Sequence, residues 1–229
     1  MATTWFTYNG KGLTSRAGYA LGSGDPYNPL NLPPYTIRVQ YSENHSPGPG
    51  IGDSRTLVDA EHNIWDIAKY SPDWSYLFAG EWVEAVLGAN TTGVSNMESL
   101  FTNTFLKETV LFDTRSVTNM MGMFQDTKIT TCPIYPTDAV TNMELMFGGC
   151  YELREVPLLP TSSVTSVVQM FLADGKVETG SLAFYQQLST QAVPPVYHEQ
   201  CFLACGYETV SGRADLAQIP ESWGGLLRT

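Results

Sequence analysis

The stretch Val140-Thr-Asn-Met-Glu-Leu-Met-Phe147 recurs along the chain and decides which fold the sequence can adopt. Close copies are Val94-Ser-Asn-Met-Glu-Ser-Leu-Phe101, Val117-Thr-Asn-Met-Met-Gly-Met-Phe124 and Val164-Thr-Ser-Val-Val-Gln-Met-Phe171. Their terminal phenylalanines stand 23, 23 and 24 residues apart. A fixed period of this length is typical of architectures in which one structural unit is repeated and stacked.

Each copy combines two hydrophobic patterns. In its first half, apolar residues such as Met120, Met123 and Phe124 fall at helical spacing and predict a two-turn helix. In its second half, columns such as Leu111 and Ile134 alternate with other residues, as in a strand with one buried face. Because neither element can bury its apolar face alone, neighbouring copies must stack and share a core. The pattern predicts an α/β repeat; the competing interpretation is a bundle of four amphipathic helices.

One longer run carries a family resemblance. Residues 146–164 read Met-Phe-Gly-Gly-Cys-Tyr-Glu-Leu-Arg-Glu-Val-Pro-Leu-Leu-Pro-Thr-Ser-Ser-Val and resemble the BspA-like leucine-rich repeat, a surface-protein repeat. The resemblance covers residues 73–172 and, more weakly, residues 197–220. It implies a leucine-rich-repeat-like solenoid of short parallel strands and helical turns. Proteins of this kind without a signal peptide resemble bacteriophage or prophage products, and family members with known roles are largely surface and adhesion proteins.

The composition around the repeat divides the chain into four segments. Residues 1–34 are rich in Gly, Asn, Ser and Pro, and we expect an extended docking arm that contacts another subunit, another virion protein or its own domain. Residues 35–72 are predicted to form a small β capping unit. The solenoid is expected over residues 73–172, and an inserted helix, the last repeat and a C-terminal cap over residues 173–229. The aromatic residues of the arm are Trp5, Phe6, Tyr8, Tyr19 and Tyr27.

Charge and hydropathy argue against several kinds of partner. The chain has 12 Lys and Arg against 23 Asp and Glu, and the net charge of −11 repels nucleic-acid phosphates and anionic lipids. No run approaches the roughly 18 apolar residues of a membrane span, and no secretory signal peptide is visible. We therefore expect no nucleic-acid partner and no membrane insertion. The expected location is the virion if the protein comes from a phage, and otherwise the cell surface or the cytoplasm.

Two groups of residues offer reactive side chains, but neither has the context that its chemistry needs. Gly52-Asp-Ser54 resembles the nucleophile block of the Gly-Asp-Ser hydrolases, with His62 and His198 available as bases, yet it follows a Pro/Gly-rich loop instead of a strand. Cys201 and Cys205 with His198 supply only three of the four ligands of a structural zinc site. We expect no catalytic residue, no metal site and no cofactor, and hence no enzyme.

The strand-like half of each copy predicts a binding surface. If the column containing Leu111 points inward, alternation turns its neighbours outward as an exposed apolar strip with aromatic members. Such a strip usually marks a protein or carbohydrate contact, unless the N-terminal arm covers it. Prolines within the strip imply very short or irregular strands, because proline donates no ladder hydrogen bond. The strip consists of Val110, Phe112, Pro133, Tyr135, Pro157 and Leu159.

Together these features predict a non-enzymatic phage protein associated with the virion. It would be a tail or head appendage that attaches through its N-terminal arm and presents the repeat surface to a host surface protein or a glycan. The alternative is a bacterial cell-surface adhesion or scaffold protein. A more remote alternative is a hydrolase that uses Ser54.

Overall fold

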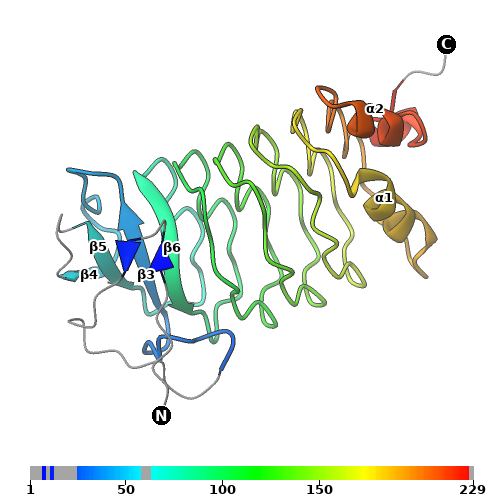
Figure 1. Ribbon diagram of the computed structural model, residues 1–229. Coiled ribbons are helices and arrows are strands. Elements are labelled where there is room, and N and C mark those ends of the chain that lie inside the picture. The colour runs from blue at the N-terminus through cyan, green and yellow to red at the C-terminus, as the bar shows by residue number, and fades with distance from the viewer. Residues whose placement is uncertain (1–6, 9–10, 13–24, 58–62, 227–229) are drawn as a thin grey trace.

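The computed structural model describes residues 7–8, 11–12, 25–57 and 63–226. Figure 1 shows a row of stacked coils with a small sheet at its N-terminal end and short helices at its C-terminal end. A minimal hairpin of β1 (Thr7–Tyr8) and β2 (Lys11–Gly12) precedes these parts. The coils therefore form the middle of the molecule.

The regular sheet consists of four antiparallel strands in the order β4-β5-β3-β6. They are β3 (Thr36–Tyr41), β4 (Asp53–Leu57), β5 (Ile64–Ala68) and β6 (Val83–Asn90). The apolar side chains of β3 are fully buried, as the β-branched and aromatic composition of this strand favours. The exposed β4 forms one edge of the sheet, and β6 leads into the coils.

A buried ion pair lies within this sheet. The guanidinium of Arg38 on β3 donates to both carboxylate oxygens of Asp66 on β5, at 2.7 and 3.0 Å. Arg55 on β4 donates to the same carboxylate at 2.8 Å. Because the side chains of Arg38 and Asp66 are only 6% and 5% exposed, this pair links β3 and β5 where water cannot replace it, and the exposed Arg55 adds β4.

A column of stacked phenylalanine rings runs through the centre of the coils. Consecutive ring centroids lie 5.4, 5.9, 5.7, 5.3 and 5.8 Å apart, with nearly parallel planes. Every ring in the column is fully buried. The repeated phenylalanine thus joins the coils into one continuous core. The column consists of Phe78, Phe101, Phe124, Phe147, Phe171 and Phe202.

The prediction of a two-turn helix in each copy is wrong. A residue in the middle of each segment has a positive φ: 51° at Ser99, 60° at Gly122 and 53° at Leu145. A left-handed residue cannot continue a right-handed α-helix. Alternate backbone N–H groups instead donate to the following coil, as from Ser99 to the Met121 carbonyl at 2.7 Å and from Phe101 to the Met123 carbonyl at 2.9 Å. Consecutive tight turns produce the same apolar spacing as a helix.

The motif asparagine stabilises these turns. The side-chain oxygen of Asn119 accepts a hydrogen bond from the backbone N–H of Met121 at 3.1 Å, and Asn142 makes the same bond to Glu144 at 2.9 Å. An asparagine that bonds two residues ahead in this way closes an Asx turn. The Val-Thr-Asn-Met pattern is therefore explained by turn chemistry and not by helix formation.

The expected fold class, an α/β leucine-rich-repeat-like solenoid of short parallel strands and helical turns, is also wrong. The only sheet larger than a hairpin in the described part of the chain is antiparallel. The helices there are short and lie outside the coils. The first, α1 (Ser181–Thr190), comes between the coils of Phe171 and Phe202, whereas α2 (Val210–Leu216) and a 3-10 turn at Glu221–Trp223 come after the last coil. Between coils, parallel pairing is limited to isolated bridges such as Asn96 to Asn119. Turns thus take the place of regular elements.

The described end of the N-terminal arm docks on its own chain. Leu32 is buried, and its carbonyl accepts a hydrogen bond from the side chain of Asn90 at 2.8 Å. The ring of Tyr27 lies 5.3 Å from the guanidinium of Arg115. An arm that contacts its own domain was one of the expected alternatives. Of the other arm aromatics, Trp5, Phe6 and Tyr19 lie outside the described residues, as does the side chain of Tyr8.

The last coil is covered by the C-terminal residues. The backbone N–H of Phe202 donates to the carbonyl of Trp223 at 2.8 Å, in place of a further coil. The ring of His198 stacks on the Trp223 indole with centroids 4.1 Å apart. These contacts close the end of the core that would otherwise be open to water.

Candidate functional site

The aromatic members of the predicted surface strip lie in the core. Phe112, Tyr135 and Leu159 are fully buried, and the first two rings stack with centroids 5.5 Å apart. The Tyr135 hydroxyl donates to the Val110 carbonyl at 3.2 Å, so the buried phenol keeps a hydrogen-bond partner. The prediction of an exposed aromatic strip is therefore wrong. Of its other members, Val110 and Pro133 are half-buried and Pro157 is buried.

The same face carries an aliphatic strip in the opposite register. Ile134 is 52% exposed and Leu158 is 45% exposed, while Leu111 in the preceding coil is half-buried. Inward and outward side chains do alternate along this extended segment, as predicted. The residues predicted to point inward point outward, however, and those predicted to point outward point inward. Large aromatic rings stack better in the continuous core than shorter aliphatic chains do, which favours the observed register.

Backbone pairing between coils is interrupted beneath this strip. On either side of it, Val86 donates to the Glu108 carbonyl at 3.1 Å and Val156 donates to the Thr179 carbonyl at 3.0 Å. Within the described residues, no backbone hydrogen bond joins residues 131–133 to residues 108–110 or to residues 155–157. Pro133 and Pro157 contribute to the gap, because proline has no N–H to donate.

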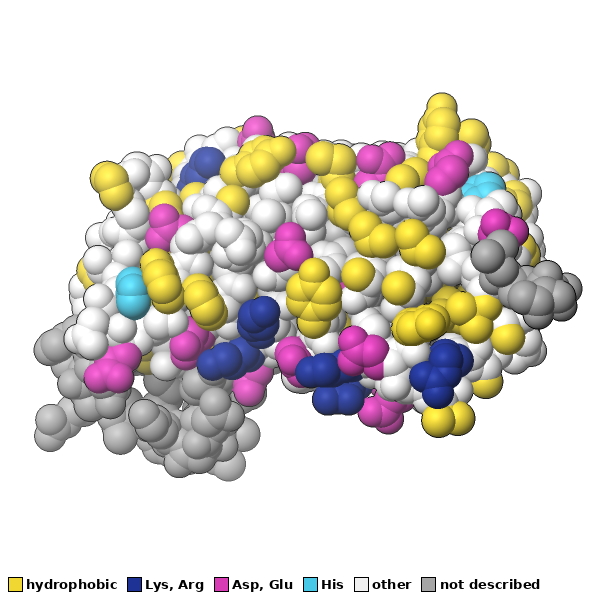
Figure 2. All heavy atoms as spheres, turned by 90° about the horizontal axis from the view of Figure 1, so that it is seen from above, with side chains coloured by type: hydrophobic (Ala, Val, Ile, Leu, Met, Phe, Trp, Pro, Cys, Tyr) yellow, Lys and Arg dark blue, Asp and Glu magenta, His cyan; other side chains and the backbone are white. Residues whose placement is uncertain are grey.

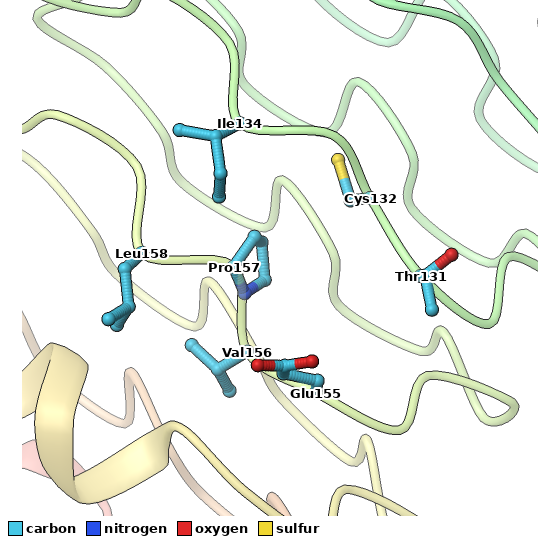
Figure 3. A pocket seen from close by; sticks show the side chains of 7 residues that line it. All are labelled: Thr131, Cys132, Ile134, Glu155, Val156, Pro157 and Leu158. Atoms are coloured by element: carbon cyan, nitrogen blue, oxygen red, sulfur yellow. The ribbon is translucent and has the colours of Figure 1, made fainter.

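The interruption opens a cleft, here called the slit, between two neighbouring coils. A hydrogen bond between the two coils closes each end of the slit. At one end the Arg154 N–H donates to the Thr130 carbonyl at 3.1 Å, and at the other the Thr137 hydroxyl donates to the Pro160 carbonyl at 2.6 Å. Its volume is about 380 Å³. Figure 3 shows the side chains of both coils around it. The slit is lined by Thr131, Cys132, Ile134, Glu155, Val156, Pro157 and Leu158.

The cysteine in the slit is not an activated nucleophile. Burial raises the pKa of the Cys132 thiol, which donates a weak hydrogen bond to the Pro133 carbonyl at 3.4 Å. A thiol is reactive as its thiolate, and here the thiolate is disfavoured. The arrangement supports binding in the slit rather than covalent chemistry.

A second exposed feature is a short aromatic row on the coil surface. His45 stacks on Trp82 with centroids 4.0 Å apart, and Trp82 stacks on Phe105 at 4.8 Å. Trp82 and Phe105 are 45% and 40% exposed. Figure 2 shows hydrophobic side chains spread along one face of the molecule with acidic and basic groups beside them. Trp82 thus stacks on a ring on either side, whereas His45 and Phe105 each stack on one ring within the row.

The structure does not assemble the hydrolase arrangement. Ser54 is exposed on β4, the edge strand at the N-terminal end, whereas His198 stacks on Trp223 in the C-terminal cap. His62 lies outside the described residues.

The cysteines do not form the zinc site considered above. Cys201 and Cys205 are buried, and burial raises the pKa of each thiol. Across the part of the chain that the structure describes, no group of three or more His, Cys, Asp or Glu is placed to hold a metal ion.

One buried acid was missed at the level of sequence. Asp174 is fully buried, and neither carboxyl oxygen has a hydrogen-bond partner. Burial raises the pKa of this carboxyl well above its usual range and so favours its protonated form. It stands three residues after Phe171, at the position that Thr127 and Cys150 occupy after their phenylalanines. An aspartate at a repeat position that otherwise holds threonine or cysteine was the signal in the sequence that could have identified this acid.

Comparisons with known proteins place a family match on the repeats. The model of a family described as "Mycoplasma protein of unknown function, DUF285" matches residues 73–184, a little under half of the chain. No curated protein and no solved structure matches. The expected recognition as a BspA-like leucine-rich repeat is therefore wrong, and the matches contain no evidence of a phage protein. Within the described residues, no helix is long and apolar enough to cross a membrane. The repeats of this chain are thus similar to the DUF285 family.

Proposed function

We propose that this chain is a non-enzymatic protein-binding module that contacts its partner through the slit and the aliphatic side chains at its rim. The observation that carries the proposal is the position of Ile134 and Leu158, each about half exposed beside an open cleft between two coils. Exposed apolar side chains around a concavity are the usual anchor of a protein contact. Adhesion and scaffold roles both rest on such a contact.

The chemistry of the slit favours a protein over a glycan. The slit is lined mainly by aliphatic side chains, and Glu155 is its only charged lining residue. A sugar ring commonly stacks on an open aromatic face, and the residues that line the slit include no aromatic side chain. Binding without catalysis is supported by the neutral Cys132 thiol.

The rim is large enough to contribute measurable affinity. Complete burial of an aliphatic side chain is worth about 1.5–3 kcal/mol, so covering the exposed halves of Ile134 and Leu158 contributes roughly 1.5–3 kcal/mol together. That corresponds to roughly 10- to 100-fold in the dissociation constant. Loss of the rim should therefore be easy to detect.

A display library of random peptides, selected against the full chain, tests the proposal. Binders are measured on wild type, on the Ile134→Lys/Leu158→Lys double variant, and on a Val193→Lys/Val196→Lys control. The control residues are 71% and 65% exposed and do not line the slit, and both variants change the net charge equally. We expect the rim variant to lose at least about tenfold in affinity and the control to bind as wild type. Binders that tolerate the rim variant would overturn the proposal.

A further inference from the structure

The peptide groups on the two walls of the slit have defined directions. The Val156 N–H donates forward to the Thr179 carbonyl at 3.0 Å. All peptide bonds in the described residues are trans, so the carbonyl of Glu155, in the same peptide unit, points the opposite way, into the slit. It accepts no backbone hydrogen bond among the described residues. One wall of the slit therefore presents a free acceptor.

The opposite wall presents a free donor. Cys132 occupies the position in its coil that Val86 and Val156 occupy in theirs, and both of those N–H groups donate toward the next coil. The Cys132 N–H has the same place in the repeat but no backbone acceptor within the described chain. The slit thus contains one donor and one acceptor that a regular coil would have paired with each other. Unpaired groups of this kind are costly if a partner covers them without replacing their hydrogen bonds.

From this arrangement we infer that the slit receives a carboxamide, the side-chain group of asparagine and glutamine, from the bound protein. This inference rests on the proposed function and specifies the chemistry of its anchor. The carboxamide oxygen accepts from the Cys132 N–H, and its NH₂ group donates to the Glu155 carbonyl. The interrupted bond between the coils is replaced by a bridge of two hydrogen bonds, while the partner's aliphatic atoms contact Ile134 and Leu158.

Other side chains match the slit less well. Lysine and arginine carry donors only and leave the Cys132 N–H unpaired, whereas a carboxylate carries acceptors only and meets the Glu155 side chain. An aliphatic side chain leaves both backbone groups unpaired. A carboxamide is neutral and carries an acceptor oxygen and an NH₂ donor on the same carbon, so one planar group can meet both backbone groups. The pairing logic therefore selects it over the charged and apolar alternatives.

Small probes test the inference on the full chain. Propionamide, butanone and propylammonium have similar apolar parts but offer a donor and acceptor, an acceptor only, and donors only. Each is titrated into ¹⁵N-labelled protein while the backbone amides of residues 131–134 and 155–158 are followed by NMR. We expect propionamide to bind about tenfold more tightly than either other probe, because it makes one hydrogen bond more. The Cys132 amide should show the largest shift.

A Cys132→Pro variant removes the donor and should abolish the preference for propionamide over propylammonium, because each probe then makes one hydrogen bond, to the Glu155 carbonyl, with folding checked by circular dichroism. If this variant does not fold, the three probes on wild type still decide. Equal binding of all three probes, or shifts outside the slit, would overturn the inference. If library binders require Ile134 and Leu158 but propionamide does not bind, the proposed function stands and the carboxamide anchor fails. If propionamide binds in the slit but the binders do not require Ile134 and Leu158, the slit accepts a carboxamide and the proposed function fails.

Discussion

Replacing Phe147 by alanine should destabilise the protein strongly because this ring joins two others. It is fully buried, with ring centroids 5.7 Å from Phe124 and 5.3 Å from Phe171. A buried Phe→Ala change costs about 3–5 kcal/mol, of which each stacked aromatic pair supplies about 0.5–1.5 kcal/mol. The terminal ring of Phe78 stacks only on Phe101 among the described rings. We therefore expect Phe147→Ala to exceed Phe78→Ala by about 0.5–1.5 kcal/mol.

The measurement is urea unfolding followed by circular dichroism and tryptophan fluorescence. Phe147→Leu serves as the matched control, since it keeps an apolar side chain and loses only the ring contacts, and it should cost about 1–3 kcal/mol from its two stacked pairs. A Phe147→Ala cost below about 1 kcal/mol would refute the continuous core. Equal costs at Phe147 and Phe78 would refute the additive contribution of the stacked rings.

Three further perturbations probe other parts of the structure. Asp66→Asn removes the buried carboxylate that pairs with Arg38 and should cost about 3–5 kcal/mol in urea unfolding, whereas Arg55→Ala, at a 60% exposed side chain, should cost under about 1 kcal/mol. Because the pKa of Asp174 is raised in the folded state, the folded protein binds more protons, and this residue lowers stability as the pH rises from its unfolded pKa toward its raised folded pKa. Asp174→Asn should flatten that slope in unfolding curves recorded between about pH 4 and pH 7, and an unchanged slope would contradict the assignment. Gly122→Ala forces a side chain onto a φ of 60° with its Cβ 3.1 Å from the Ser99 hydroxyl, and a melting temperature equal to wild type would contradict the expected loss of about 1–2 kcal/mol.

The local conformation of the repeat was beyond what the pattern could resolve. Apolar residues at positions such as Met120, Met123 and Phe124 line one face of a helix, but turns with a left-handed residue at Gly122 present them inward equally well. Hydrogen bonds to the next coil satisfy the backbone that a helix would have satisfied internally. The choice between the two depends on a neighbouring coil 23 residues away, which a local pattern does not contain.

The candidate site shows the same limit. Alternation near Pro133 identified an extended segment and its irregularity, but a period of two is satisfied by either register. Stacking of Tyr135 on Phe112 turned the aromatic column inward and left Ile134 outside. The slit itself arises from hydrogen bonds that are missing between coils, and so no single segment could reveal it.

By itself, the sequence determined the period, the shared phenylalanine column and the composition, which has few charged residues and an excess of acidic ones. These features follow from residue identity and spacing alone. Only the tertiary structure decided the turn conformation, the register that buries Tyr135, the isolation of Asp174 and the opening between Cys132 and Glu155. The physical reason is that each of these depends on contacts between consecutive coils, whose energies are set by the three-dimensional packing of residues that are distant along the chain.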